Sequence, residues 1–191
     1  MRLELIAHPA AAAEGRVAVE LVAQQNALRV VYEIESVDVI ILPSRRAAVV
    51  QRCDELWRHT CCELFAAPVA LVAMAQGGAY REFNFSPSGD WAAYAFDSPR
   101  CGMRPLALDE APRVKQSART AVTPIGERSR PALDLSVEVE LPRSAVVDYP
   151  FLWPTVILET TLGISYWALR HYGPQADFHR VENLLTAIGV A

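Results

Sequence analysis

The sequence predicts an all-β fold, an antiparallel β-sandwich of jelly-roll type with at most short helical turns. Three observations predict it: apolar and polar residues alternate with period two, turn residues separate the alternating runs, and helical periodicity is weak. The clearest alternation runs from Leu133 to Leu141, where odd positions are apolar and even positions are Asp, Ser or Glu. Such a run is typical of a strand with one buried face and one solvated face.

Shorter runs of the same kind predict further strands. Turn residues separate them, and the glycine-containing loop Ser86–Asp90 is typical of a β-hairpin connection. These strands are expected at Arg2–Ala7, Arg16–Val22, Leu28–Glu35, Val37–Leu42, Cys61–Phe65, Ala79–Phe85, Trp91–Phe96, Arg113–Arg119, Thr155–Glu159 and Ile164–Leu169.

Few segments favour helix. Ala47–Trp57 fits a short helix or a loop, and Val181–Ile188 fits one terminal helical turn. Asp109–Pro131 is the most loop-like stretch because it contains prolines at 112, 124 and 131. No repeat, low-complexity segment or linker divides the chain, so residues 1–191 are expected to form one domain.

Composition narrows the function classes. Apolar residues make up 52% and charged residues 21% of the 191 residues, which excludes a disordered chain or a coiled coil. A general nucleic-acid binder usually carries an excess of positive charge, whereas this chain has a net charge of -4. The chain shows neither a secretory signal nor a run of ~18 apolar residues, so we expect a cytoplasmic protein without membrane contact.

The four cysteines, Cys53, Cys61, Cys62 and Cys101, form no Cys-x-x-Cys pair. Their spacing does not favour a zinc site. In a reducing compartment we expect buried free thiols.

Three segments are rich in aromatic and polar side chains: residues 56–65, 80–94 and 164–179. On a strand, alternate residues share a face, so Trp57, His59, Cys61 and Glu63 are expected on one side. In the second segment Phe83 and Phe85 are expected on one face, and Tyr80, Glu82 and Asn84 on the other.

The three segments resemble the DOMON-like domain proteins, a group related to family-9 carbohydrate-binding modules. The resemblance lies in "LWRHTCCELF", "EFNFSPSGDWAAYAFD" and "ISYWALRHYGPQADFH", and it extends over about residues 45–179. It implies a β-sandwich with a jelly-roll-like core and no catalytic centre, in a superfamily whose members bind sugars or haem. The sequence departs from the pattern at Cys62, where a Phe is expected, and in its apolar end after His179.

A non-catalytic site for a small ligand is therefore expected, with a carbohydrate as the leading class. A sugar site combines aromatic surface with a few well-placed polar groups. The candidate stacking residues are Trp57, Trp91, Tyr94 and Trp167, and the candidate hydrogen-bonding residues are His59, Glu63, Glu82 and Asn84. On this expectation Trp91→Ala abolishes binding without unfolding the protein. The competing interpretation places the tryptophans in the core and gives Asn84 a role in the turn.

Alternative functions remain open. A haem-binding domain could use Met74 or Met103 as an axial ligand. An interaction module or a homodimer could use the apolar residues 187–191 as its contact surface. An enzyme is disfavoured because the catalytic motifs for nucleophiles, phosphates and zinc are missing. Nevertheless Glu63, Glu82 and Asp90 are carboxylates that can pair as in a glycosidase.

Metal binding is also disfavoured. His59, Cys61 and Glu63 lie at period two on one strand, and such a set rarely completes a tetrahedral site. Asp177 and His179 are expected to hold the loop after Tyr172 by hydrogen bonds.

Overall fold

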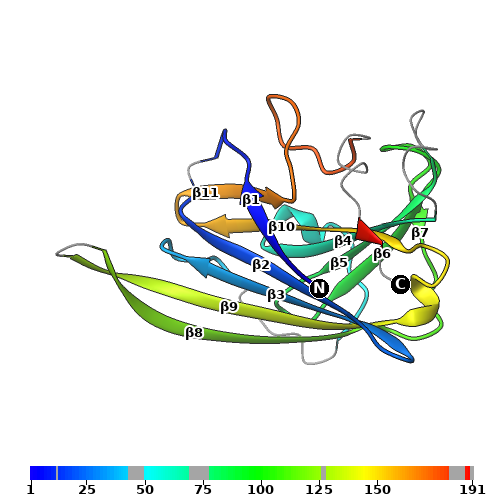
Figure 1. The fold of residues 1–191 in the computed structure, drawn as a ribbon, viewed down its shortest axis with the longest axis horizontal. Helices are drawn as coiled ribbons and strands as arrows, with labels where there is room; N and C mark the ends of the chain where they lie inside the picture. Colours follow the sequence, from blue (N-terminus) through cyan, green and yellow to red (C-terminus); the bar gives the residue numbers. More distant parts are fainter. Residues whose placement is uncertain (12, 43–49, 69–77, 126–127, 181–187, 190–191) are drawn as a thin grey trace.

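The structure is a computed structural model that describes residues 1–11, 13–42, 50–68, 78–125, 128–180 and 188–189 (Figure 1). The described part consists of antiparallel strands and two 3-10 turns, η1 (Leu56–Arg58) and η3 (Arg143–Ala145). The predicted all-β antiparallel fold is confirmed. No described helix is both long enough and apolar enough to span a bilayer.

The strands form one continuous sheet that curls on itself (Figure 1). The curl lies at β1 (Arg2–Ala7), which pairs with β2 through Arg2–Leu5 and with β11 through Ile6 and Ala7. On one side of β1, sheet A contains β2 (Gly15–Ala23), β3 (Ala27–Ser36), β9 (Arg128–Pro142) and β8 (Arg113–Ile125). On the other, sheet B contains β11 (Gly163–Ala168), β10 (Phe151–Thr160), β4 (Cys61–Ala67), β5 (Tyr80–Phe85), β6 (Trp91–Phe96) and β7 (Arg104–Pro105). The short β12 (Ile188–Gly189) also pairs with β10.

The main core fills the space between the two sheets. The predicted alternation in β9 is confirmed, because Leu135, Val137, Val139 and Leu141 are all buried in it. Sheet B contributes the alternate side chains of its strands, among them Leu64, Phe83, Phe85, Val156 and Trp167.

Sheet B also buries its second face, which we call the outer face. A separate apolar cluster lies there, in which Phe65 stacks on Trp153 with ring centroids 5.3 Å apart. Leu56 and Trp57 of η1 and Phe178 of the segment after β11 pack against this cluster. Since both faces are covered, β4 is buried at each of its seven positions.

The Ser86–Asp90 hairpin forms as predicted between β5 and β6. The Ser86 amide donates to the Asp90 carbonyl at 2.9 Å, and Gly89 has φ 102°, a conformation that favours glycine.

Two sequence expectations about strands are wrong. Val37–Leu42 is not a strand, since its described pairing is the single bridge between Ile40 and Thr160. Asp109–Pro131 is not mainly loop, because it includes β8 and the start of β9. The prolines are compatible with these strands. Pro124 lies on the edge strand β8, and Pro131 precedes Leu133, the first residue of β9 that pairs with β3.

Strand β10 is longer than the predicted Thr155–Glu159, and it includes Pro154. Among the described residues, Pro154 pairs with Leu64, and the strands on the other side of β10 pair with residues 151–152 and 155–160.

Other expectations are partly outside the described residues. Of Ala47–Trp57, residues 50–57 are described and contain only the start of η1 as helical structure. Residues 181–187 of the predicted terminal turn lie outside the described part, and Ile188 belongs to β12. Cys61 and Cys62 are buried free thiols as predicted, whereas Cys53 is half-buried and Cys101 is exposed.

One buried hydrogen bond crosses the main core. The Tyr32 hydroxyl of β3 donates to the Glu63 carbonyl of β4 at 2.7 Å. We expect Tyr32→Phe to lower the free energy of unfolding by about 1–2 kcal/mol, because the buried hydrogen bond from Tyr32 to the Glu63 carbonyl is lost. Denaturant unfolding measures this difference. Tyr149→Phe, which keeps the ring over which Arg81 lies, is the matched control and should change stability by less than about 0.5 kcal/mol. Equal effects of the two changes would contradict a structural role for this hydrogen bond.

Candidate functional site

A cavity of about 360 Å³ lies on the outer face of sheet B. Sheet B forms its floor, and η1, the turn after β6 and residues 176–179 form its walls. The lining residues are Trp57, Glu63, Glu82, Phe96, Arg100, Met103, Ile157, Tyr166, Ala176, Asp177, Phe178 and His179. Its volume is within the range of small-molecule sites, which starts at about 300 Å³.

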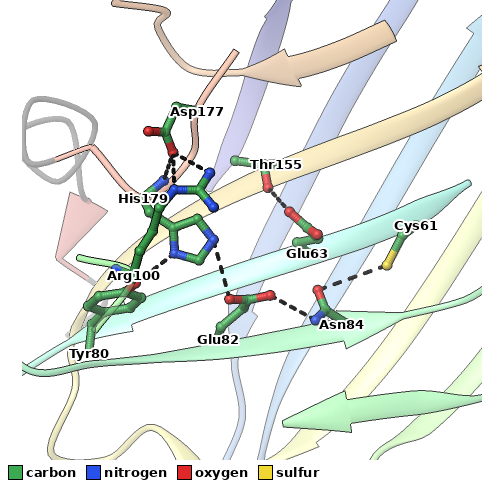
Figure 2. Close-up of polar contacts among 9 residues, drawn as sticks. All are labelled: Cys61, Glu63, Tyr80, Glu82, Asn84, Arg100, Thr155, Asp177 and His179. Carbon is green, nitrogen blue, oxygen red and sulfur yellow. Dashed lines mark hydrogen bonds and ion pairs between the residues drawn. The ribbon is translucent and has the colours of Figure 1, made fainter. Parts of the chain in front are cut away.

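Two buried carboxyl groups lie on the floor (Figure 2). Glu63 of β4 and Glu82 of β5 are only 2% and 5% exposed. They share a face because Glu63 lies opposite Asn84 in the ladder, two residues from Glu82. Thr155 donates to Glu63 at 2.9 Å, and the Asn84 amide donates to Glu82 at 2.8 Å.

Burial governs the protonation of this pair. Loss of water raises the pKa of Glu82 to about 7, although the Asn84 hydrogen bond and the Arg100 charge lower it. Desolvation also raises the pKa of Glu63 well above its usual range, and the neighbouring charge of Glu82 raises it further. A pair of perturbed carboxyls inside a cavity is typical of a functional site.

His179 lies above Glu82 and belongs to a hydrogen-bonded chain. The Tyr80 hydroxyl is 2.6 Å from His179 Nδ1 and accepts from the Arg100 amide at 3.3 Å. In the tautomer in which Tyr80 donates to Nδ1, the imidazole carries its proton on Nε2, and this nitrogen lies 3.7 Å from Glu82 Oε2. Desolvation, helped by the Arg100 charge, lowers the pKa of His179 to about 4, so its ring is neutral at neutral pH.

An ion pair closes one side of the cavity. The Arg100 guanidinium donates twice to Asp177 Oδ1, from Nε at 3.2 Å and from Nη2 at 2.8 Å. The same oxygen accepts from the His179 amide at 3.1 Å, which confirms that Asp177 and His179 hold this loop by hydrogen bonds. Arg100 has φ 60°, a strained value for a residue with a side chain, in a turn that directs it toward the cavity.

The segment leading to Asp177 is fixed at its base by two histidines. His171 Nε2 donates to the Ile6 carbonyl at 2.8 Å, and the rings of His8 and His171 meet edge to face at 4.9 Å. This anchoring to β1 places Phe178 and His179 over sheet B.

Trp57 forms an aromatic wall. Its ring meets Tyr94 edge to face at 5.7 Å, and the Tyr94 hydroxyl donates to Asp54 at 2.6 Å. Tyr94 thus contacts Trp57 and holds Asp54, the residue two positions before η1, whereas Trp57 itself lines the cavity.

The structure brings together half of the predicted site residues. Trp57, Glu63 and Glu82 line the cavity, and Asn84 orients Glu82 from the same face. Tyr94 lies behind Trp57 rather than in the lining.

The other predicted residues lie elsewhere. His59 is exposed and pairs with Glu159 at 2.8 Å, because residues 57–59 belong to a turn rather than to the expected strand. Trp91 and Trp167 point into the main core between the sheets, on the opposite face of sheet B. The reason is register: Trp91 pairs with Phe85, and Trp167 pairs with Val156, both core residues. The expectation that Trp91→Ala abolishes binding therefore does not follow from this geometry.

Sequence reasoning missed Arg100 and did not assign His179 or Phe178 to the site. His179 and Phe178 lie in the third aromatic-rich segment, so the signal was present. Arg100 has no comparable signal, because its place depends on the turn after β6.

A scan against protein-family models and a search of curated proteins find no match to this chain. The described residues contain no group of three or more His, Cys, Asp or Glu side chains arranged to hold a metal ion.

In this arrangement two carboxyls can accept hydrogen bonds from the hydroxyl or amino groups of a ligand. The aromatic rings provide flat apolar surface. Carboxylates with spare lone pairs form strong, directional hydrogen bonds. These are the features of a site for a small polar ligand with an apolar face.

The stability of the protein should report the opposite pKa shifts of Glu82 and His179. The raised pKa of Glu82 gives stability that is present below pH 4.5 and is lost as pH rises through about 7. The lowered pKa of His179 has the opposite sign, because stability is lost as pH falls from 6.5 to about 4. Between these limits the two contributions oppose each other.

We expect His179→Gln to make the free energy of unfolding fall more steeply with rising pH than in the wild type, by up to about 1.4 kcal/mol per pH unit. Glu82→Gln should shift the slope in the other direction, and the double variant should return to the wild-type slope. Chemical denaturation between pH 4.5 and 6.5 measures these slopes. Single variants with the same slope would contradict this assignment of protons.

Proposed function

We propose that this protein is a non-catalytic binding module and that its ligand is a small carbohydrate held in the cavity on the outer face of sheet B. The observation that supports the proposal is the combination of Glu63 and Glu82 on the floor with Trp57, Phe96, Tyr166 and Phe178 in the lining. A pyranose has an apolar face that an aromatic ring covers and hydroxyl groups that carboxylates bind. The volume suits a monosaccharide or one terminal unit of a longer sugar.

The polar groups are held in place before any ligand arrives. Thr155 and Asn84 orient the carboxyls, and Asp177 orients Arg100. Such preorganisation reduces the entropy lost on binding. The resemblance to DOMON-like and family-9 carbohydrate-binding proteins supports the same ligand class.

The haem alternative has weaker support from the cavity. Met103 lines it, but both ring nitrogens of the lining histidine, His179, face protein groups. A Soret band after addition of haem would favour this alternative.

Binding should depend on Trp57 and not on Trp91. The two tryptophans lie on opposite faces of sheet B, and each is partly buried. We expect Trp57→Ala to weaken sugar binding at least tenfold, about 1.4 kcal/mol, because it removes an aromatic wall. Trp91→Ala is the matched control and should keep the wild-type affinity, although it lowers stability.

A thermal-shift screen of mono- and disaccharides identifies the sugar, and calorimetry gives its affinity. A ligand at 100 times its dissociation constant adds about 2.7 kcal/mol and raises the midpoint by roughly 5–10 °C. Loss of affinity in Trp91→Ala with retention in Trp57→Ala would place the site on the other face. Release of reducing sugar from an aryl glycoside would contradict a non-catalytic role.

A further inference from the structure

Acidic side chains outnumber basic ones among the described residues of the cavity lining. Three carboxyl groups, those of Glu63, Glu82 and Asp177, line the cavity together with a single guanidinium, that of Arg100. Arg100 already donates two hydrogen bonds to Asp177. His179 adds no charge at neutral pH, because burial lowers its pKa to about 4.

The two floor carboxyls have neutral partners. In the described part of the chain, Thr155 donates the short hydrogen bond to Glu63 and Asn84 donates that to Glu82. The ion pairs among these residues include no Lys or Arg nitrogen within 4.0 Å of either carboxyl. Each ionised carboxylate has about four acceptor sites, and the hydrogen bonds from Thr155 and Asn84 use one on each.

The walls suit a cation as well as a sugar ring. Trp57, Phe96, Tyr166 and Phe178 place aromatic rings around the same space. The face of an aromatic ring attracts a positive charge within about 6 Å of its centre. Buried carboxylates are stabilised by a paired cation, and the described part of the chain places no Lys or Arg nitrogen within 4.0 Å of either floor carboxyl.

We propose that the ligand of this cavity carries a protonated amino group that pairs with Glu63 and Glu82, so that an amino sugar is preferred over the neutral sugar of the same shape. This inference rests on the carbohydrate site proposed above. The ammonium group replaces a ring hydroxyl, and its three N–H donors fit two neighbouring carboxyls.

A proton balance follows from the same geometry. Because burial raises the pKa of Glu82 to about 7 and that of Glu63 well above its usual range, the floor holds protons at neutral pH. Binding of an ammonium group favours the ionised carboxylate, and the displaced proton passes to solvent. The titratable or charged groups that face the pair on this side of sheet B include Cys61, Tyr80, Tyr94, Arg100, Asp177 and His179.

The test is calorimetry at pH 7 with matched probes: glucose and glucosamine, galactose and galactosamine, mannose and mannosamine, the N-acetyl form of each amino sugar, and cyclohexylamine. We expect at least one amino sugar to bind tenfold or more tightly than its neutral parent, and N-acetylation to remove the preference. Repeating the titration in buffers of different ionisation enthalpy should show proton release.

Variants assign the preference to the floor. Glu82→Gln should reduce the amine preference to within threefold, and Glu63→Gln provides a second test if the first variant does not fold. Glu159→Gln, whose carboxylate lies outside this cavity and pairs with His59, is the matched control and should keep the preference. Thermal unfolding verifies that each variant is folded.

The outcomes separate the two proposals. Equal affinity for neutral and amino sugars overturns the inference and leaves the carbohydrate site intact. Binding of cyclohexylamine alone, lost in Glu82→Gln, supports the amine and overturns the carbohydrate proposal. Absence of binding by every probe overturns both.

Discussion

Burial of sheet B on both faces is the constraint on which the rest of this structure depends. A sheet that faces solvent on one side needs apolar residues only at alternate positions, whereas β4 is buried throughout. The inner face packs on sheet A because the sheet curls at β1. The outer face must be covered by segments that are not strands, and η1 and residues 176–179 meet that need.

The covering is incomplete where the floor is polar. Apolar side chains such as Phe65 and Trp153 seal one part of the outer face by stacking. Around Glu63 and Glu82 the covering segments do not pack directly on the sheet, and the cavity lies between them and the floor. A buried carboxyl destabilises the fold unless it is neutral or hydrogen-bonded, and here both conditions contribute: each carboxyl has one neutral donor, and burial favours its protonated form.

The site and the stability of the fold are therefore linked. Hydrogen bonds to two of the lining residues also hold the cover in place: Tyr80 binds His179, and Arg100 binds Asp177. A polar network of this kind is stable only when its members are satisfied together. The cover and the floor are thus parts of one arrangement, which connects the last segment of the chain to β4 and β5.

The sequence by itself determined most of the strands, the Ser86–Asp90 hairpin and the opposite orientations of Phe83 and Glu82. These are local properties, set by side-chain alternation and turn residues. It also singled out Trp57, Glu63, Glu82 and Asn84, which the structure gathers at one place. It did not reveal that prolines at 124, 131 and 154 lie within strands, because that depends on how the strands pair in the sheet.

Only the tertiary structure decided which face of sheet B each aromatic residue occupies. Trp57 and Trp91 look alike in sequence, yet one lines the cavity and the other packs in the main core. The turn that carries Arg100 and the anchoring of residues 171–179 to β1 bring distant groups to the floor. Contacts across so many residues leave no period in the sequence, because they depend on how the sheet curls and what must cover it.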